Sequence, residues 1–516
     1  MSELRSPQPL GAFGIPAGFM LVPGGDEITE ARLELAAGRV PREWPAALEV
    51  HRLVHADDLA GALALLAEAP SDPIPRYHLW LIGIDAAATE GEAGRERLLE
   101  ESARVRAALP ESVAPLVDVV LHTLGLGGSP AERAPGPSVL PEVRALVLAS
   151  SATEALRTGD TSRALAALFA ASEAARSNAP VLQALLLATS GALKADLGDA
   201  EGAEADLAAA DQGLADSDLN DVRAEVLLRR GSLAQQGAAS ASNARASLQE
   251  AMRHYYAGLQ LVTEQSSPQV WASLNLNLAT AQLAVPMSSA SDQLRLGVAA
   301  QSLRASRRVF TCETHPQQWA VATLDLANAL VYTPSTHQAD NLVEAVELYE
   351  QVLTSGARGD DPLARARLLT NQANALAHLG VFDEARPKLH EAKSLFEQHL
   401  QHESALAVGS ILEQIRQAEA ENAAAPGSGS DELTDVTDLA ELARRAEQMS
   451  RMPSPASFSS GMGVRVTRGV GHRGGRDGHE AGQGDRRVAG LGGIDTTPPP
   501  PTRVTVVDPS TRPTKE

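Results

Sequence analysis

The sequence predicts an all-α fold, a solenoid of repeated helical hairpins followed by a disordered tail. Three observations favour this fold class. The chain of 516 residues contains 90 alanines and only 3% aromatic residues, a composition that suits closely packed helices better than β-sheets. A helical segment that begins with proline recurs at a nearly constant offset, and each copy is followed by a second amphipathic segment. Internal repeats of this length are typical of solenoids.

The first part of the chain is predicted to precede the repeats. Residues 1–25 contain an acid at Glu3 and several prolines and glycines, so they make a poor signal peptide and are predicted to be a flexible N-terminus. Residues 26–124 hold segments with an apolar stripe between prolines and glycines, but without clear repeat marks. We expect them to form a degenerate helical cap. A Gly- and Pro-rich loop is predicted at 125–138.

The helical repeat is clearest between residues 268 and 397. The segment PQVWASLNLNLATAQ begins at Pro268 and PQQWAVATLDLANAL begins at Pro316, an offset of 48 residues. A third copy begins at Pro362 and ends in NQANALAHLG. Proline is tolerated in the first turn of a helix, so each copy is predicted to open a helix at its proline.

A second helix is predicted after each of these. After Gly380, the residues Ala385, Leu389 and Ala392 place small, large and small side chains on one helix face. Pro387 lies inside this pattern, so the helix is predicted either to be kinked or to begin later. The same spacing recurs upstream, which makes the repeating unit a helical hairpin.

This pattern resembles the tetratricopeptide repeat, a hairpin of about 34 residues with a small residue where its two helices cross. The resemblance implies a right-handed superhelical array of about six hairpins over residues 140–421. The small crossing residues would be Ala152, Gly191, Gly231, Ala279, Ala327 and Ala373. The copies with Pro-x2-Trp-Ala are similar to repeats of bacterial proteins in which a caspase-like CHAT protease domain follows the array, and no such domain is predicted here.

The remaining chain changes character. Residues 422–430 are predicted to be a linker and residues 431–449 an isolated amphipathic helix. Residues 450–516 include a stretch, 461–494, with 12 glycines in 34 residues. Such a segment buries too little apolar surface to offset its chain entropy, so we predict a disordered tail. A frame error in a GC-rich gene is the alternative explanation of this segment.

Charge and cysteine content exclude several classes of partner. The formal net charge is −21, and residues 451–516 carry ten Lys and Arg against six Asp and Glu, so the rest of the chain carries −25. So acidic a body repels phosphate groups, and we expect neither nucleic-acid nor membrane binding. Cys312 is the single cysteine, which fits a reducing compartment. We therefore expect a cytoplasmic protein.

No catalytic residue, metal site or cofactor is predicted. The sequence contains neither a phosphate-binding GxxxxGK[ST] loop nor a GxSxG nucleophile motif. His51 and His55 stand four residues apart without a third ligand, and we interpret them, like His399 and His402, as ordinary histidines on helix surfaces. Cys312 is interpreted as an inert thiol. We expect no small-molecule substrate.

The resemblance implies a partner-binding groove along the first helices of the hairpins. By that resemblance the residues facing a ligand are Asn277, Thr280, Asp325, Asn328, Asn371 and Asn374. An asparagine side chain both donates and accepts hydrogen bonds, so stacked asparagines suit an extended peptide backbone. The alternative is that these side chains only bridge neighbouring helices or cap turns. Tyr332 and His378 stand where a carboxylate-binding groove would carry basic residues, so capture of a free C-terminal carboxylate is not expected.

The function predicted from these features is a non-catalytic scaffold that binds a peptide or protein partner in the concave groove of the array. The alternative is a regulatory or sensor subunit that controls a separately encoded effector, such as a caspase-like protease in a bacterial signalling or defence system. That alternative rests on the similarity to the repeats that precede CHAT domains.

Overall fold

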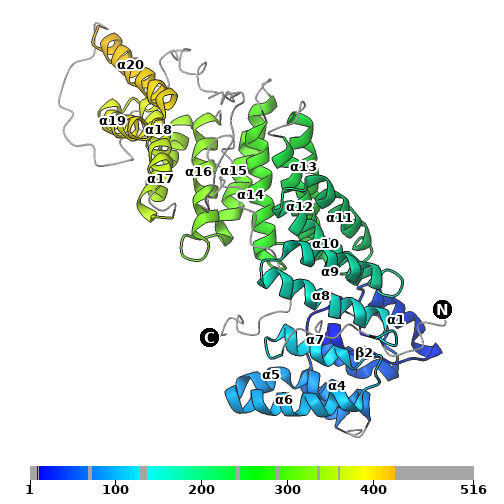
Figure 1. Ribbon diagram of the computed structural model, residues 1–516. Coiled ribbons are helices and arrows are strands. Elements are labelled where there is room, and N and C mark those ends of the chain that lie inside the picture. Colours follow the sequence, from blue (N-terminus) through cyan, green and yellow to red (C-terminus); the bar gives the residue numbers. More distant parts are fainter. Residues whose placement is uncertain are drawn as a thin grey trace, which may run out of the picture. The chain divides into compact units, whose positions relative to one another are not determined.

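The computed structural model describes residues 8–9, 11–67, 72–127, 136–238, 244–285, 291–333, 337–357 and 361–424. In these ranges the chain is built mainly from helices, as predicted (Figure 1). The predicted helix at 431–449 and the predicted tail at 450–516 lie outside the described residues. The last described helix, α20 (His402–Ala424), extends into the start of the predicted linker.

The chain divides into two compact units. Residues up to Leu233 make up most of the first unit. Its elements are β1 (Gln8–Pro9), η2 (Ala17–Phe19), β2 (Leu21–Val22), η3 (Asp26–Ile28), α1 (Thr29–Ala36), η4 (Ala46–Leu48), α2 (Glu49–His55), α3 (Leu59–Leu66), α4 (Pro73–Ile82), α5 (Ile84–Thr89), α6 (Gly91–Ala108), α7 (Pro115–Thr123), α8 (Pro141–Arg157), α9 (Thr161–Ala175), α10 (Pro180–Asp196) and α11 (Ala200–Gly213). Helix α12 (Asn220–Gly237) contains the boundary between the units.

The second unit contains the clearest repeats. Its further helices are α13 (Ala244–Leu259), α14 (Pro268–Ala284), α15 (Ser291–Val309), α16 (Pro316–Tyr332), α17 (Gln338–Ser355), α18 (Pro362–His378), α19 (Phe382–Gln398) and α20. Each helix from α13 to α20 packs against the next one in the chain. In the first unit α8, α9, α10 and α11 pack in the same consecutive way. The described array therefore consists of tetratricopeptide-like helical hairpins.

Helix ends follow from the residues that the sequence places there. Five first helices, α8, α10, α14, α16 and α18, have proline in their first turn, where the missing N–H costs no hydrogen bond. Helix α12 begins at Asn220 instead. Gly380 ends α18 with a backbone φ of 78°, which a side chain would strain. Pro387 lies inside α19, which begins at Phe382. The expectation that this helix begins later is therefore wrong.

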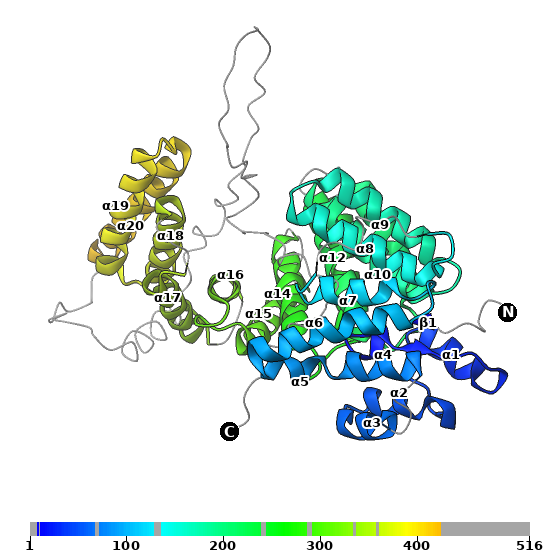
Figure 2. The same cartoon turned by 60° about the horizontal axis from the view of Figure 1, so that its bottom comes forward.

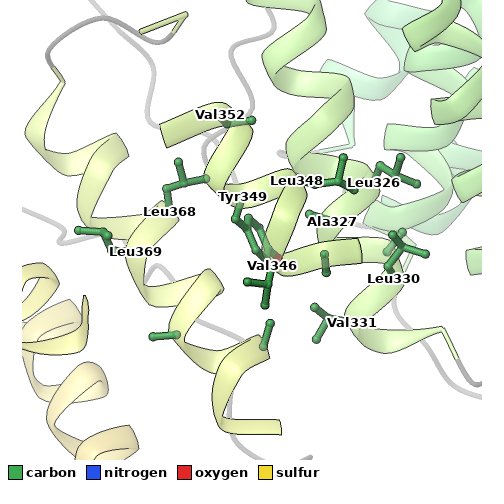
Figure 3. Packing of buried hydrophobic residues seen from close by; sticks show 14 of the residues in the cluster. Leu326, Ala327, Leu330, Val331, Val346, Leu348, Tyr349, Val352, Leu368 and Leu369 are labelled. Carbon is green, nitrogen blue, oxygen red and sulfur yellow. The ribbon is translucent and has the colours of Figure 1, made fainter. Parts of the chain in front are cut away.

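Small residues allow the helices to cross closely. A Cβ atom on Gly191 would lie 2.7 Å from Cγ of Leu207 on the paired helix, so even alanine would force a shift. Ala279, Ala327 and Ala373, at the equivalent positions of the second unit, are fully buried. Figure 3 shows Tyr349 of α17 between side chains of α16 and side chains of α18. The predicted crossing positions in these hairpins thus lie in the core.

The helical cap before the array is irregular. The helices α2 to α5 are short, and together with the longer α6 they pack against one another (Figure 2). Residues 1–25 were expected to be flexible, but Met20, Leu21 and Val22 are fully buried. Strand β2 also pairs with β1 in antiparallel fashion, Gln8 opposite Val22. For this part of the segment the expectation is wrong, because its apolar residues supply core that the small helices lack.

Candidate ligand-binding surface

The six predicted ligand-facing residues all lie on three first helices of the second unit. Asn277 and Thr280 belong to α14, Asp325 and Asn328 to α16, and Asn371 and Asn374 to α18. We call these six residues the polar row. Within each helix the two members are three residues apart, so they lie on one helix face.

Thr280 and Asp325 join the first two of these helices. Oγ1 of Thr280 lies 3.1 Å from Oδ2 of Asp325 and 3.0 Å from the carbonyl oxygen of Leu276. The hydroxyl has one proton to donate to these two acceptors. Both side chains are buried. Thr280 and Asp325 therefore connect α14 to α16 and present little surface to a ligand.

Asn328 connects three helices. Its Oδ1 atom accepts a hydrogen bond from the Tyr349 hydroxyl at 2.6 Å and another from Nδ2 of Asn371 at 3.2 Å. Two donors on one oxygen fill its two lone pairs and fix which way the amide points. Asn328 thus holds α16 against α17 and α18.

Asn374 interacts with a tyrosine of the preceding first helix. It hydrogen-bonds to Tyr332, the last residue of α16. Burial raises the pKa of the Tyr332 phenol, and the hydrogen bond with Asn374 opposes that rise. The Tyr332 residue nevertheless keeps 54% of its surface exposed. An aromatic side chain therefore borders the polar row at α18.

Hydrogen-bonding capacity remains on two of the asparagines. Asn328, Asn371 and Asn374 are half-buried. The hydrogen bonds of Asn328 use its oxygen, and the one made by Asn371 uses its nitrogen. Across the described ranges, Nδ2 of Asn328 and Oδ1 of Asn371 are left without a partner. One donor and one acceptor therefore stand side by side on neighbouring helices.

For four of the six residues the structure supports the alternative interpretation made from the sequence. Thr280, Asp325, Asn328 and Asn371 bridge neighbouring helices, as the alternative expected. Whether the row also binds a ligand stays a prediction. The tyrosine partners, Tyr332 and Tyr349, were not predicted, because Tyr349 follows Asn328 by 21 residues in the sequence. The only signal for Tyr349 was its place as the large residue in the Ala345, Tyr349, Val352 pattern.

The other candidate residues lie elsewhere. His51 is buried, and burial lowers the pKa values of both His51 and His55. Their interpretation as surface histidines is therefore wrong. Cys312 is half-buried in the turn between α15 and α16. In the part of the chain that the structure covers, no group of three or more His, Cys, Asp or Glu side chains could hold a metal ion. In the same part, no helix combines the length and apolarity needed to cross a membrane.

Comparisons with known proteins identify no family. Neither a model of a protein family nor a curated protein matches the sequence. Among solved structures, the chain is similar to the one described as "Crystal Structure of Rap Protein Complexed with Competence and Sporulation Factor", with 12% sequence identity and a TM-score of 0.34. The match covers 72% of this chain and 97% of that chain. With so low a TM-score, this likeness carries no conclusion about what the polar row does.

Proposed function

We propose that the protein is a non-catalytic interaction scaffold and that its polar row binds an extended peptide segment of a partner protein. The observation that supports this most is the pair formed by Asn328 and Asn371. Internal hydrogen bonds use the oxygen of one amide and the nitrogen of the other. The two remaining groups, an N–H donor and a C=O acceptor, are the complement of the C=O and N–H of one residue in an extended peptide.

The chemistry of the row favours recognition of the peptide backbone over recognition of charge. Its half-buried members, Asn277, Asn328, Asn371 and Asn374, are uncharged amides. The one carboxylate in the row, Asp325, is buried and accepts a hydrogen bond from Thr280. Tyr332 adds an exposed aromatic ring beside Asn374. These groups suit an uncharged extended segment with an apolar side chain for the ring to contact.

A conservative substitution separates binding from packing. Asn328→Asp keeps an oxygen that accepts from Tyr349 and Asn371 but replaces the amide nitrogen, which those two hydrogen bonds do not use, by a second oxygen. We expect this variant to retain its thermal melt while its affinity for a peptide falls at least about tenfold, the effect of about one lost hydrogen bond. The probe is a linear peptide selected on the full chain from a phage-displayed random library. Its affinity is measured by isothermal titration calorimetry.

The matched control is Asn341→Asp, the same change on α17, at a half-buried asparagine outside the polar row. This variant should bind the selected peptide as the wild type does. If the wild type and both variants bind the selected peptide with equal affinity, Asn328 has only a structural role. A library selection that enriches no peptide would contradict the proposed binding.

We also propose a cytoplasmic location, and regulation of a separate effector as the alternative function. The single cysteine supports a reducing, cytoplasmic environment. The alternative role as a regulatory subunit of a separately encoded effector is supported only by the sequence resemblance.

A further inference from the structure

Two buried histidines hold the backbone of one residue in the first unit. The Leu21 N–H of strand β2 donates a hydrogen bond to Nε2 of His78 on α4 at 3.0 Å. The Leu21 carbonyl oxygen lies 3.3 Å from Nε2 of His51 on α2. The His51 and His78 rings meet edge to face, with centroids 5.5 Å apart. Both histidines and Leu21 are buried.

The two hydrogen bonds and the burial of the rings favour neutral imidazoles. A carbonyl oxygen only accepts, so Nε2 of His51 donates its proton to Leu21, and in the neutral ring Nδ1 carries no proton. That Nδ1 atom is buried, and no partner for it occurs in the described ranges. Nε2 of His78 accepts from an N–H, so it carries no proton. Protonating His78 would set two donors against each other, and protonating His51 would bury an unpaired N–H.

The surroundings do not favour positive charge. Burial lowers the pKa of His51 to about 4 and holds that of His78 well below its usual range, and the His51 imidazole lowers the pKa of His78 further. The hydrogen bonds with Leu21 oppose these shifts but do not outweigh them. His55, four residues after His51 on α2, acts on His51 in the same direction. Tyr77 on α4 lies beside His78, and burial raises its pKa, so it stays neutral. None of the groups that shift these two pKa values is a carboxylate.

The N-terminal segment that contains Leu21 is also connected to the repeat array. The Tyr77 hydroxyl donates to the Phe19 carbonyl oxygen at 2.8 Å, just before β2. Strand β2 pairs with β1, and β1 contacts α8, the first helix of the first described hairpin. A Cβ atom on Gly11 would lie 3.0 Å from a methyl group of Leu182 on α10. Strand β2 is therefore linked to two hairpins of the same unit.

We propose that His51 and His78 form an acid-sensitive clamp, which releases residues 17–22 from the helical cap, and with them the contacts of β1 and Gly11 with α8 and α10, when both imidazoles become protonated.

The direction of the pH effect follows from the pKa shifts. Once β2 leaves, both imidazoles meet water and return to pKa values of about 6.5. The released state thus binds protons more readily than the docked state. Docking is strongest above about pH 6.5 and weakens as the pH falls from there toward about 4, by up to about tenfold per pH unit for each histidine.

Hydrogen exchange measured by mass spectrometry on the full chain tests this clamp between pH 7.5 and 4.5. Rates are corrected for the intrinsic pH dependence of amide exchange. We expect opening of the segment around Leu21 to increase below about pH 6.5, by up to about 100-fold per pH unit. A segment of α10 serves as the internal reference for global unfolding. Wild-type protection that does not change with pH, or that falls equally at Leu21 and in α10, would overturn the proposal.

Substitutions assign the effect to the two histidines. In the double variant His51→Gln/His78→Gln, each glutamine can still donate or accept at Leu21 but does not titrate. This variant should keep the segment docked at every pH tested. His390→Gln, at an exposed histidine of α19, should behave as the wild type. If the segment around Leu21 is already open at pH 7.5 in the double variant, the single variants His51→Gln and His78→Gln test the clamp instead. In each of them the logarithm of the opening equilibrium should change with pH about half as steeply as in the wild type. Variants as steep as the wild type would refute the clamp.

Discussion

At the scale of single residues, Tyr349 connects the core of the second unit to the polar row. Its ring is almost fully buried, and its hydroxyl donates to Oδ1 of Asn328 at 2.6 Å. Burial raises the pKa of the phenol, so the hydroxyl keeps the proton that it donates. The orientation of the Asn328 amide therefore depends on a residue that no ligand would touch.

Removing the Tyr349 hydroxyl should destabilise the fold and leave the Asn328 amide less firmly oriented. Tyr349→Phe leaves the ring in place but removes one of the two donors to Oδ1 of Asn328. We expect the free energy of unfolding to fall by about 1 kcal/mol, the usual net value of such a hydrogen bond, as measured by urea denaturation. Tyr256→Phe is the control, because Tyr256 is exposed and its oxygen accepts from Gln282 at 3.0 Å. A loss at Tyr256 as large as that at Tyr349 would contradict this assignment.

The two sites differ in how far sequence patterns could predict them. The residues of the polar row repeat at offsets close to the repeat length, so a pattern in the sequence placed them on one face. His51 and His78 bind Leu21 from 30 and 57 residues away. No local periodicity connects these three residues, because the partner of each histidine is a backbone group in an irregular segment.

At the scale of elements, the turn between α19 and α20 has a leucine where the turn after α18 has a glycine. Leu400 N–H donates to the Glu397 carbonyl oxygen, and Gln401 N–H donates to that of Phe396. The same two hydrogen bonds end α18, where Gly380 occupies the left-handed position. Leu400 takes this position with a φ of 57°. In this left-handed conformation the Cβ atom of a leucine is strained, whereas glycine has no Cβ atom.

Leu400→Gly should therefore stabilise the chain. Leu400 is 75% exposed, so the change loses little buried surface. Relief of the left-handed strain outweighs the chain entropy of glycine, and the free energy of unfolding should rise by about 0.5–1 kcal/mol in urea denaturation. Gly380→Ala, the reverse change in the equivalent turn, should destabilise. A destabilised Leu400→Gly protein would show that the leucine makes a contact that its exposure hides.

The helices themselves were predictable because their signals are local. Proline at the first turn, glycine after the last one, and small residues at the crossings all act within a few residues or within one hairpin. The N-terminal segment was not predictable in the same way. Prolines and glycines in residues 1–25 indicate an irregular backbone, and they do not tell whether that backbone is exposed or, like Met20 and Leu21, buried.

At the scale of the whole molecule, stability in a repeat array comes from contacts between neighbouring helices. The last described helix, α20, packs against α19 and α18. It buries Val408, Ile411 and Ile415 in the core of the second unit. Its more exposed positions are mainly polar, apart from Leu406. A polar outer face of this kind is what the end of a solenoid requires for solubility.

Two truncations should distinguish residues that build the array from residues that follow it. Deleting residues 450–516, rich in glycine and carrying an excess of positive charge, should leave the thermal melt unchanged, because such a segment has too little apolar surface to bury. Deleting residues 402–516 also removes α20 and uncovers the apolar faces of α18 and α19, so the melting temperature of the second unit should fall by several degrees. Differential scanning calorimetry of both proteins beside the full chain makes the comparison. If the shorter deletion alone lowers the melt, residues 450–516 pack on the array, and the prediction of a disordered tail fails.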